Sequence, residues 1–354
     1  MENSEKTRSL LIKHYKAYPE LQIQDVFKFL YQSSFGCEHL ISSLERVTDY
    51  IAKEYNAVQS GNDIQIEQLD GNYSRVHLSY LKGGISVDTF GKLFFLSAKK
   101  EVNALANLEK KLEVAKNLVL DGLLPFSVYE FENAVNQWKN NGYHAISHSD
   151  IFRGKYKPSY RLIANEYIPF LPLFAELDKR ISMGRVRLAV EGGSASGKTT
   201  LSKLLESLYD CTLFHMDDFF LQPEQRTAER FAEIGGNVDR ERFLNEVLQP
   251  LKRGDIINYR RFNCQNMKIE KAVQISPKKL TVIEGAYSMH PELAHFYDYS
   301  VFLDIGEDLQ KKRIENRNTP ELAKRFFNEW IPLEKIYFEK TNVKKRCDRV
   351  IEII

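Results

Sequence analysis

The sequence predicts two structural classes in one chain, a mostly α-helical N-terminal half and an α/β C-terminal half built on a parallel sheet. Three observations lead to this prediction. Apolar residues recur at helical spacing up to about residue 180, short β-branched runs alternate with helical patterns from Val186 onward, and a glycine-rich stretch follows the first of these runs. A chain of 354 residues is also too long for one ordinary hydrophobic core. We therefore expect two domains.

Helical periodicity dominates the first half of the chain. The residues that share helix faces are Leu40, Leu44, Val47 and Ile51 in one segment, and Leu105, Leu108, Leu112 and Ala115 in another. The stretch Tyr73–Leu81 alternates partly and ends before two glycines, so we expect one short strand or hairpin there. The boundary is expected near residue 183, where a helical pattern ends in Gly184 just before the first strand. Residues 1–183 would then form a mostly helical accessory domain.

The second half reads as strand, helix, strand, which is the pattern of a parallel α/β sheet. The predicted strands are "VRLAV", "CTLFHM", "LTVIE", "YSVFLDI" and "RVIEII".

Composition and charge exclude several classes of protein. The 50 basic and 48 acidic residues leave a net charge of +2, so we expect neither nucleic acid nor an anionic membrane as a partner. The N-terminus lacks a leader-like pattern and no apolar run approaches the roughly 18 residues of a membrane span, so we expect a cytoplasmic protein. The cysteines have no spacing suited to zinc or a redox dithiol, and reduced thiols are expected. They are Cys37, Cys211, Cys264 and Cys347.

The stretch "EGGSASGKTT" matches the phosphate-loop pattern G-x-x-x-x-G-K-[ST] without a mismatch, between a predicted strand and a predicted helix. Small residues let successive backbone N–H groups curl around a phosphate at a helix N-terminus. Lys198 is expected to reach the β- and γ-phosphates, and the Thr199 hydroxyl to ligate Mg²⁺. The expected nucleotide-binding residues are Gly192, Gly193, Ser194, Ala195, Ser196, Gly197, Lys198, Thr199 and Thr200. The sequence thus predicts ATP and Mg²⁺ as cofactors.

Acidic side chains follow two further predicted strands. Asp217 and Asp218 end the apolar run of "CTLFHMDDFF", at the edge where parallel sheets bind ligands, and one of them could accept a proton from an attacking hydroxyl. Glu284 ends "LTVIE", a position from which a carboxylate could approach the metal or its waters. Asp304 ends another strand and is expected to be structural.

Several segments in order resemble the uridine kinase and phosphoribulokinase family of P-loop kinases. They are "EGGSASGKTT", "HMDDFF", "GGNVDRERF", "VIEGAY" and the basic helix after "FLDI". The resemblance covers residues 184–354 and implies an α/β P-loop kinase domain, in which a parallel sheet is flanked by helices. It also implies ATP-dependent phosphoryl transfer to a hydroxyl of a small-molecule acceptor, a nucleoside or riboside.

The resemblance assigns roles to three aspartates. Asp217 resembles the family's catalytic base, and Asp218 is then a magnesium ligand or a structural partner. Asp239 resembles the aspartate that holds ribose hydroxyls, because a carboxylate accepts two hydrogen bonds from a vicinal diol. It would serve equally well as the N-cap of the helix that begins "RERFLNEVL", and both interpretations remain open.

The helix predicted after "FLDIGEDLQ" carries Arg313 and Arg317 four residues apart, on one face. A solvated basic face is the ordinary interpretation of such a pair. After a P-loop kinase core, however, the segment resembles the lid whose arginines neutralise charge on the transferring phosphate. Arg313 matches the family's catalytic arginine best, Arg317 would contact the nucleotide, and Arg325 is a weaker match.

The acceptor side departs from the family pattern. Uridine kinases read the base with a tyrosine, a phenylalanine and a histidine, whereas this chain has "NYRRFNCQN" without the histidine. Tyr259 and Phe262 could stack on a ring. Arg260 and Arg261 would suit an acceptor that carries phosphate or carboxylate, or would belong to a surface loop.

The first half contains no pattern of this specificity. The stretch Arg153–Leu162, "RGKYKPSYRL", interleaves basic and aromatic residues in a way that could bind RNA or a nucleotide. The near-neutral net charge argues against RNA. A nucleotide-sensing regulator, with the first domain as output, is the alternative to a kinase, whereas a GTPase would need an NKxD segment that this chain lacks. The sequence does not predict the oligomeric state.

Overall fold

The computed structural model describes residues 2–41, 43–58 and 65–353, which form two compact units, Met1–Ala175 and Glu176–Ile354. The division falls inside helix α8 (Leu171–Met183). A kinase domain that begins at Gly184 stays a prediction. None of the described helices combines the length and apolar character that crossing a bilayer requires.

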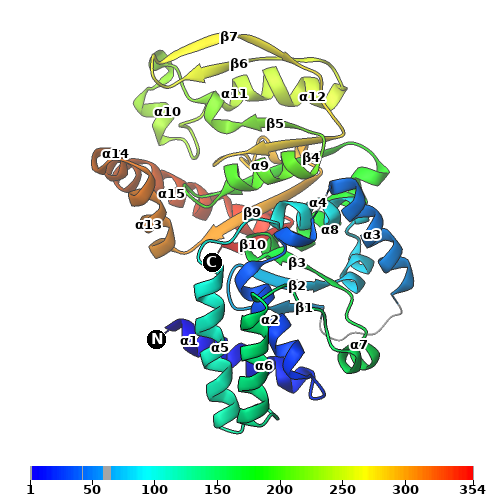
Figure 1. The fold of residues 1–354 in the computed structure, drawn as a ribbon. Coiled ribbons are helices and arrows are strands. Elements are labelled where there is room, and N and C mark those ends of the chain that lie inside the picture. Colours follow the sequence, from blue (N-terminus) through cyan, green and yellow to red (C-terminus); the bar gives the residue numbers. More distant parts are fainter. Residues whose placement is uncertain (1, 42, 59–64, 354) are drawn as a thin grey trace. The chain divides into compact units, whose positions relative to one another are not determined.

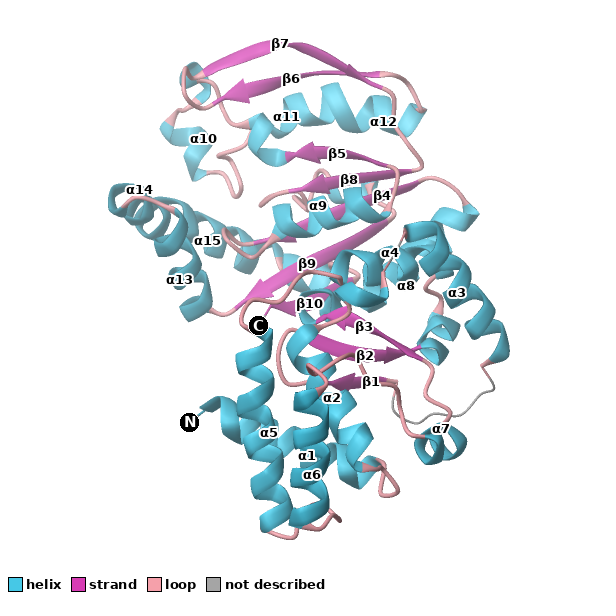
Figure 2. Ribbon diagram, in the orientation of Figure 1, coloured by secondary structure: helices cyan, strands magenta, loops and turns pink. Residues whose placement is uncertain are grey.

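Unit 1 is mostly helical, as the sequence predicts (Figures 1 and 2). Its α-helices before α8 are α1 (Glu2–Ala17), α2 (Ile23–Phe35), α3 (Leu44–Ala57), α4 (Val87–Ser97), α5 (Ala104–Leu120), α6 (Val128–Asn140) and α7 (Asp150–Tyr156). Its strands β1 (Ile66–Gln68), β2 (Tyr73–His77) and β3 (Tyr160–Ala164) form one antiparallel sheet with β2 in the centre. Short 3₁₀ helices span Glu38–Leu40, Leu78–Gly83 and Asn165–Phe170.

Local signals explain where several of these helices begin. Ser43, Ser86, Ser127 and Ser149 each accept a hydrogen bond from a backbone N–H of the first helical turn. The predicted strand near Tyr73 is β2, whereas β1 and β3 were not expected from the sequence.

Two residues assigned to buried helix faces are exposed instead. Leu40 precedes α3 and is 55% exposed, and Leu105 lies in the first turn of α5 and is 51% exposed. The other six predicted face residues lie in α3 and α5. Helical periodicity identified the right faces but extended them past the turns that pack against a neighbour.

Unit 2 is built on a five-stranded parallel sheet in the order β10-β9-β4-β8-β5, which confirms the predicted α/β fold. The strands are β4 (Val186–Gly192), β5 (Cys211–His215), β8 (Leu280–Glu284), β9 (Tyr299–Ile305) and β10 (Arg349–Ile353). The first strand, β4, lies between β8 and β9, so the strand order reverses there. Ligands of open α/β sheets bind beyond the carboxyl ends of strands at such a point.

Helices and a hairpin complete unit 2. The α-helices are α9 (Lys198–Leu208), α10 (Ala228–Ala232), α11 (Arg240–Phe243), α12 (Gln249–Arg253), α13 (Glu307–Arg317), α14 (Pro320–Arg325), α15 (Ile331–Thr341) and α16 (Val343–Arg346). A π-helical turn, Leu244–Leu248, joins α11 to α12, and another, Phe326–Trp330, joins α14 to α15. The antiparallel hairpin of β6 (Ile257–Asn263) and β7 (Lys268–Ile275) was not predicted and lies beside α11 and α12 in Figure 1.

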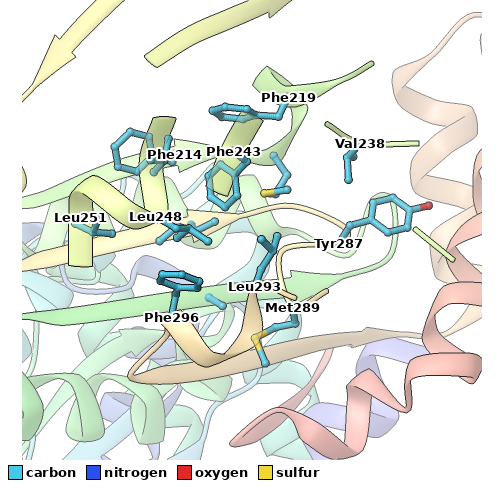
Figure 3. Close-up of a cluster of buried hydrophobic side chains, with 14 of the residues drawn as sticks. Phe214, Phe219, Val238, Phe243, Leu248, Leu251, Tyr287, Met289, Leu293 and Phe296 are labelled. Carbon is cyan, nitrogen blue, oxygen red and sulfur yellow. The ribbon is translucent and has the colours of Figure 1, made fainter. Parts of the chain in front are cut away.

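A buried apolar cluster anchors the segment that follows β5 (Figure 3). Met216 and Phe219 are both buried, and the ring of Phe219 lies 4.8 Å from that of Phe243 between centroids. The two residues between them are Asp217 and Asp218. Because both flanking side chains are locked into the core, the backbone that carries the two carboxylates is held in place.

Candidate active site

The glycine-rich loop between β4 and α9 is curled by residues with positive φ. Gly192 has φ 149°, and a Cβ there would lie 2.7 Å from the carbonyl oxygen of Leu303, so only glycine fits without a shift. Ala195 at φ 60° and Gly197 at φ 99° also lie in the left-handed region. The loop thus brings its backbone N–H groups around to the N-terminus of α9.

Lys198, the first residue of α9, folds back over this loop. Its Nζ donates to the carbonyl oxygens of Gly192 and Gly193, both at 2.9 Å. Within residues 2–41, 43–58 and 65–353 no carboxylate forms an ion pair with Lys198. The loop therefore carries a positive charge at the N-terminus of α9, which suits the phosphates of a nucleotide.

A buried carboxylate fixes the strand that enters the loop. Glu191 has no exposed surface and accepts hydrogen bonds from the N–H groups of Gly192 at 2.8 Å and Met289 at 3.0 Å and from the Tyr337 hydroxyl at 3.0 Å. Burial raises the pKa of Glu191 to about 7, against the lowering effect of these bonds. The residue stands first in "EGGSASGKTT", but its role was not predicted.

A second carboxylate grips the loop itself. Glu334 of α15 accepts hydrogen bonds from the N–H of Ser194 at 2.9 Å and from its hydroxyl at 2.6 Å. Burial raises the pKa of Glu334, and nearby Lys198 lowers it. Gln310 of α13 completes the contact by donating to the Ser194 carbonyl at 2.8 Å. Glu334 and Gln310 carry no local sequence signal, because their partner lies more than 100 residues away.

Of the three candidate arginines, two on α13 and one at the end of α14, one contacts the loop. The Arg313 guanidinium donates to the carbonyl oxygen of Ala195 at 3.2 Å. Arg317 instead lies over the ring of Phe326, 5.3 Å from its centroid, and Arg325 pairs with Glu329 at 3.1 Å. Arg313 is therefore the one of the three that contacts the loop, whereas Arg317 lies close enough to Asp217 for its charge to lower the pKa of that carboxylate.

Acidic residues from β8 and the segment after β5 meet at the start of α9. The Thr199 hydroxyl lies 3.2 Å from Oε1 of Glu284, and the same oxygen lies 2.6 Å from Nδ1 of His215. The hydrogen bond to Glu284 raises the pKa of His215. His215 immediately precedes "MDDFF", but no local pattern indicates that its side chain faces Glu284.

Asp217 faces this group. Its side chain reaches solvent, yet surrounding protein atoms deprive the carboxylate of hydration, and this desolvation raises the pKa of Asp217. The neighbouring charge of Lys198 lowers that pKa, and the negative charge of Glu284 raises it further. The structure therefore brings Asp217, Lys198 and Glu284 together, as the sequence pattern predicts.

Asp218 points to a different partner. Its Oδ2 lies 3.6 Å from Nε of Arg261, and its backbone carbonyl accepts a hydrogen bond from Arg242 at 2.9 Å. Desolvation raises the pKa of Asp218, and Arg261 lowers it. This geometry does not support the expectation that Asp218 is a magnesium ligand beside Thr199. It favours the other expectation, a structural partner, and gives Arg261 a position next to the carboxylate pair.

In the part of the chain that the structure describes, no three His, Cys, Asp or Glu side chains form a cluster that could hold a metal ion. Mg²⁺ is usually bound through one or two carboxylates together with substrate phosphates and water. The Thr199 hydroxyl and the Glu284 carboxylate, at 3.2 Å from each other, offer such a partial ligand set.

A polar cleft of about 490 Å³ lies beside the segment that carries the aspartates. Its charged lining residues are Asp239, Arg242, Glu246, Arg260 and Glu270. Three acids against two bases leave this lining with a net negative charge. The amide side chains of Gln222 and Asn245 add neutral hydrogen-bonding groups.

Asp239 acts as the N-cap of α11, one of its two expected roles. Its Oδ1 accepts from the N–H of Arg242 at 3.0 Å, and its Oδ2 accepts from Gln225 at 3.0 Å. A contact with ribose hydroxyls stays a prediction.

The two aromatic residues of "NYRRFNCQN" are placed differently from the expectation. Tyr259 has no exposed surface, and its ring lies 5.2 Å from that of Phe214 in the core, while its hydroxyl accepts from Arg261 at 2.9 Å. Phe262 is 5% exposed. Neither ring presents a free face, so the expected stacking on an acceptor ring is not supported. Alternation along β6 turns Tyr259 inward, and the register shift between Arg260 and Phe262 brings Phe262 to the same buried face. The sequence did not predict this strand.

Residues 188–321 match the model of the phosphoribulokinase / uridine kinase family, which confirms the resemblance seen in the C-terminal half. A phosphoribulokinase from Synechocystis sp. is 26% identical over 180 residues, which are 48% of this chain and 54% of that protein. A uridine kinase from Brevibacillus brevis is 27% identical over 184 residues, 47% of this chain and 84% of that protein. The chain thus spans about half the length of the first relative and most of the second.

Among solved structures, a possible uridine kinase from Bacillus stearothermophilus is 24% identical with a TM-score of 0.38, covering 50% of this chain and 99% of that one. A putative fructose transport system kinase from Silicibacter sp. TM1040 is 20% identical with a TM-score of 0.39, covering 47% of this chain and 89% of that one.

Proposed function

We propose that unit 2 is a small-molecule kinase that transfers a phosphoryl group from ATP to a hydroxyl of a nucleoside or riboside. The observation that carries the proposal is the meeting of Lys198, Asp217 and Glu284 at the carboxyl edge of the sheet, next to the curled loop. A cation for the phosphates and a carboxylate with a raised pKa then lie within one site.

The donor side rests on the loop and on Mg²⁺. When bound, ATP with Mg²⁺ would supply the transferable γ-phosphoryl group and offset its negative charge. Backbone N–H groups of the loop other than those of Gly192, Ser194 and Ser196, which already donate within the protein, would hold the phosphates. Lys198 would leave the carbonyls of Gly192 and Gly193 to bind them. Thr199 and Glu284 would hold the metal. Arg313 lies close enough to the loop to bind the charge that develops during transfer.

Asp217 would act as the general base. Its raised pKa makes it a better proton acceptor than an ordinary aspartate, while the charge of Lys198 favours its ionised form. The raised pKa of His215 has a separate cause, its hydrogen bond to Glu284, so His215 would orient Glu284 rather than receive the proton.

The cleft beside the aspartates favours an uncharged acceptor rich in hydroxyl groups. Its lining carries one more acid than base, and Arg260 is already paired with Glu246 at Nε to Oε1 2.8 Å. Carboxylates and amides suit vicinal hydroxyls, whereas an acceptor that carried phosphate or carboxylate would meet net negative charge. Arg261 is the cation that would favour such an acidic acceptor, but it lies beside Asp218 and outside this lining.

The test is a screen of the full chain with ATP and Mg²⁺ against nucleosides, vitamin-like ribosides, pantothenate and sugar phosphates, followed by mass detection of the phosphorylated product. We expect transfer to a neutral riboside. Transfer only to sugar phosphates would assign the acidic acceptor class instead. ATP binding without transfer to any acceptor would contradict the kinase proposal and favour a nucleotide-sensing regulator.

A further inference from the structure

Unit 1 contains a second pocket, of about 380 Å³, between α2, α3, α4 and β3. This volume lies in the range of small-ligand sites in proteins. We call it the basic pocket and define it by its charged side chains, Lys28, Arg46, Glu54 and Arg161. Figure 2 shows α3 and α4 close to the end of the three-stranded sheet.

Helical spacing lines up one wall of the basic pocket. Arg46, Tyr50 and Glu54 follow one another at intervals of four residues along α3, so all three side chains lie on one face. Lys28 and Gln32 repeat this spacing on α2. Two helices thus present cations and polar groups to the same space.

The floor of the basic pocket is rigid and its polar groups are satisfied. Nε2 of His148 lies 2.7 Å from the Tyr160 hydroxyl, and that hydroxyl lies 3.2 Å from Oε1 of Gln32. Desolvation lowers the pKa of His148 to about 4, so the imidazole is neutral near pH 7. Asp25 behind it is occupied by His148 at 2.9 Å and by the Ser149 hydroxyl at 2.7 Å.

The charges of the basic pocket do not cancel. Glu54 pairs with Arg161 at 2.7 Å, which leaves two of the three lining cations, Lys28 and Arg46, without an acid of their own in the lining. Lys28 donates to the carbonyl oxygen of Ile146 at 3.1 Å, and no carboxylate of the described residues forms an ion pair with it or with Arg46.

Lys28 is costly to keep charged in this position. Desolvation lowers the pKa of Lys28 to about 8, with a further lowering by the charge of Arg75 that the charge of Asp25 offsets only in part. An anion in the pocket would pair with the desolvated Lys28 and with the guanidinium of the exposed Arg46, and the charge of Lys28 would then be offset inside the pocket. At the mouth, Leu40 and Tyr50 are exposed and leave an apolar surface beside these cations.

We propose that the basic pocket binds a small ring compound that carries a phosphate or carboxylate group. The acid group would lie at Lys28 and Arg46, and the ring would cover Leu40 and Tyr50. This site is separate from the phosphate loop and gives unit 1 a ligand of its own. It also assigns a role to Tyr160 and Arg161 of the basic and aromatic stretch Arg153–Leu162, whose Arg153 and Lys155 are instead paired with Asp150 and Glu20.

The probes are 1-naphthyl phosphate and 1-naphthoate, two fluorescent ring acids that are not riboside acceptors. Their anisotropy is titrated with the full-length protein, with ATP and Mg²⁺ present to occupy the phosphate loop. We expect at least one of the two to bind. The one that binds more tightly shows whether phosphate or carboxylate is the preferred acid. We expect 1-naphthol, which lacks the charge, and inorganic phosphate, which lacks the ring, each to bind at least about 10-fold more weakly.

Variants place the binding in the pocket. Arg46→Gln and Lys28→Met should each lower the affinity for the naphthyl acid by about 10-fold or more. Lys53→Gln removes an exposed charge from α3 outside the pocket and should leave this affinity unchanged. Lys28→Met should in addition raise the melting temperature of the unliganded protein, which shows that this variant folds. Equal binding by the wild type and Arg46→Gln, equal binding of 1-naphthol, or no binding of either acid at about 5 mM would each overturn the proposal.

Discussion

Arg313 donates a hydrogen bond to the carbonyl oxygen of Ala195 at 3.2 Å, and this contact joins a basic helix to the phosphate loop across 118 residues of sequence. Arg313 is thereby distinguished from Arg317 and Arg325, which lie against Phe326 and Glu329. We predict that Arg313→Gln lowers kcat by about 100-fold, because a guanidinium near the transferring phosphate is lost. Lys311→Gln, an exposed charge on the same helix, is the matched control. Steady-state kinetics that found the two variants equal would remove Arg313 from the site.

Lys198→Ala should abolish phosphoryl transfer, because no other lysine donates to the loop carbonyls in the described structure. The melting temperature should change little, since Nζ makes no ion pair among the described residues. Lys203→Ala, on an exposed position of α9, serves as the control. Near-normal turnover of the Lys198 variant would contradict the kinase proposal.

The two adjacent aspartates should behave differently. Asp217→Asn should retain ATP affinity while kcat falls by about 100-fold or more, as expected when a positioned base is removed. Asp218→Asn should lower kcat much less, because Asp218 pairs with Arg261 at 3.6 Å and forms no hydrogen bond or ion pair with Lys198 or Thr199 among the described residues. Measuring kcat and KM for both variants decides the order of the pair. A larger loss of kcat in Asp218→Asn would reverse the assignment.

Glu191 should give the protein a distinctive dependence of stability on pH. Its pKa rises from 4.5 to about 7 on folding, so between these values the unfolded chain releases a proton that the folded chain keeps. The free energy of unfolding should therefore fall as the pH rises through this window, by on the order of 3 kcal/mol from this residue.

Chemical denaturation of the wild type and Glu191→Gln from about pH 4.5 to pH 7.5 measures this effect. As the pH rises, the free energy of unfolding of the wild type should fall relative to that of Glu191→Gln. Glu206→Gln, which removes an exposed acid from α9, should show no such trend relative to the wild type. If the difference in unfolding free energy between the wild type and Glu191→Gln did not change with pH, the Glu191 carboxyl would have the same pKa in the folded and unfolded chain.

The fragment Glu176–Ile354 should keep ATP-dependent transfer. Every residue with a proposed catalytic role lies within it, and it retains the bond from Arg180 to the carbonyl of Asp298 at 3.0 Å and the stacking of Arg180 over Tyr299 at 4.7 Å. A fragment that begins at Gly184 loses both contacts and should be less stable. Comparing kcat and acceptor KM with those of the full chain is the measurement. Loss of transfer with ATP affinity retained would show that unit 1 belongs to the active site.

The sequence alone determined the parallel sheet, the phosphate loop and the position of the first aspartate after β5. These features depend on neighbours in the chain. The loop is shaped by consecutive residues such as Gly192 and Gly197, and Asp217 lies at the sheet edge because it follows an apolar strand.

Only the tertiary structure decided which distant side chains meet. Glu334 reaches Ser194 across 140 residues, His215 reaches Glu284 across 69, and Asp218 turns to Arg261 rather than to Thr199. Tyr259, which the sequence offered as a stacking surface, is buried because β6 packs that face of the hairpin on the core. Burial and pairing depend on the free energy of packing segments that are remote in sequence. A local sequence pattern therefore does not indicate which of two adjacent polar residues contacts a given partner.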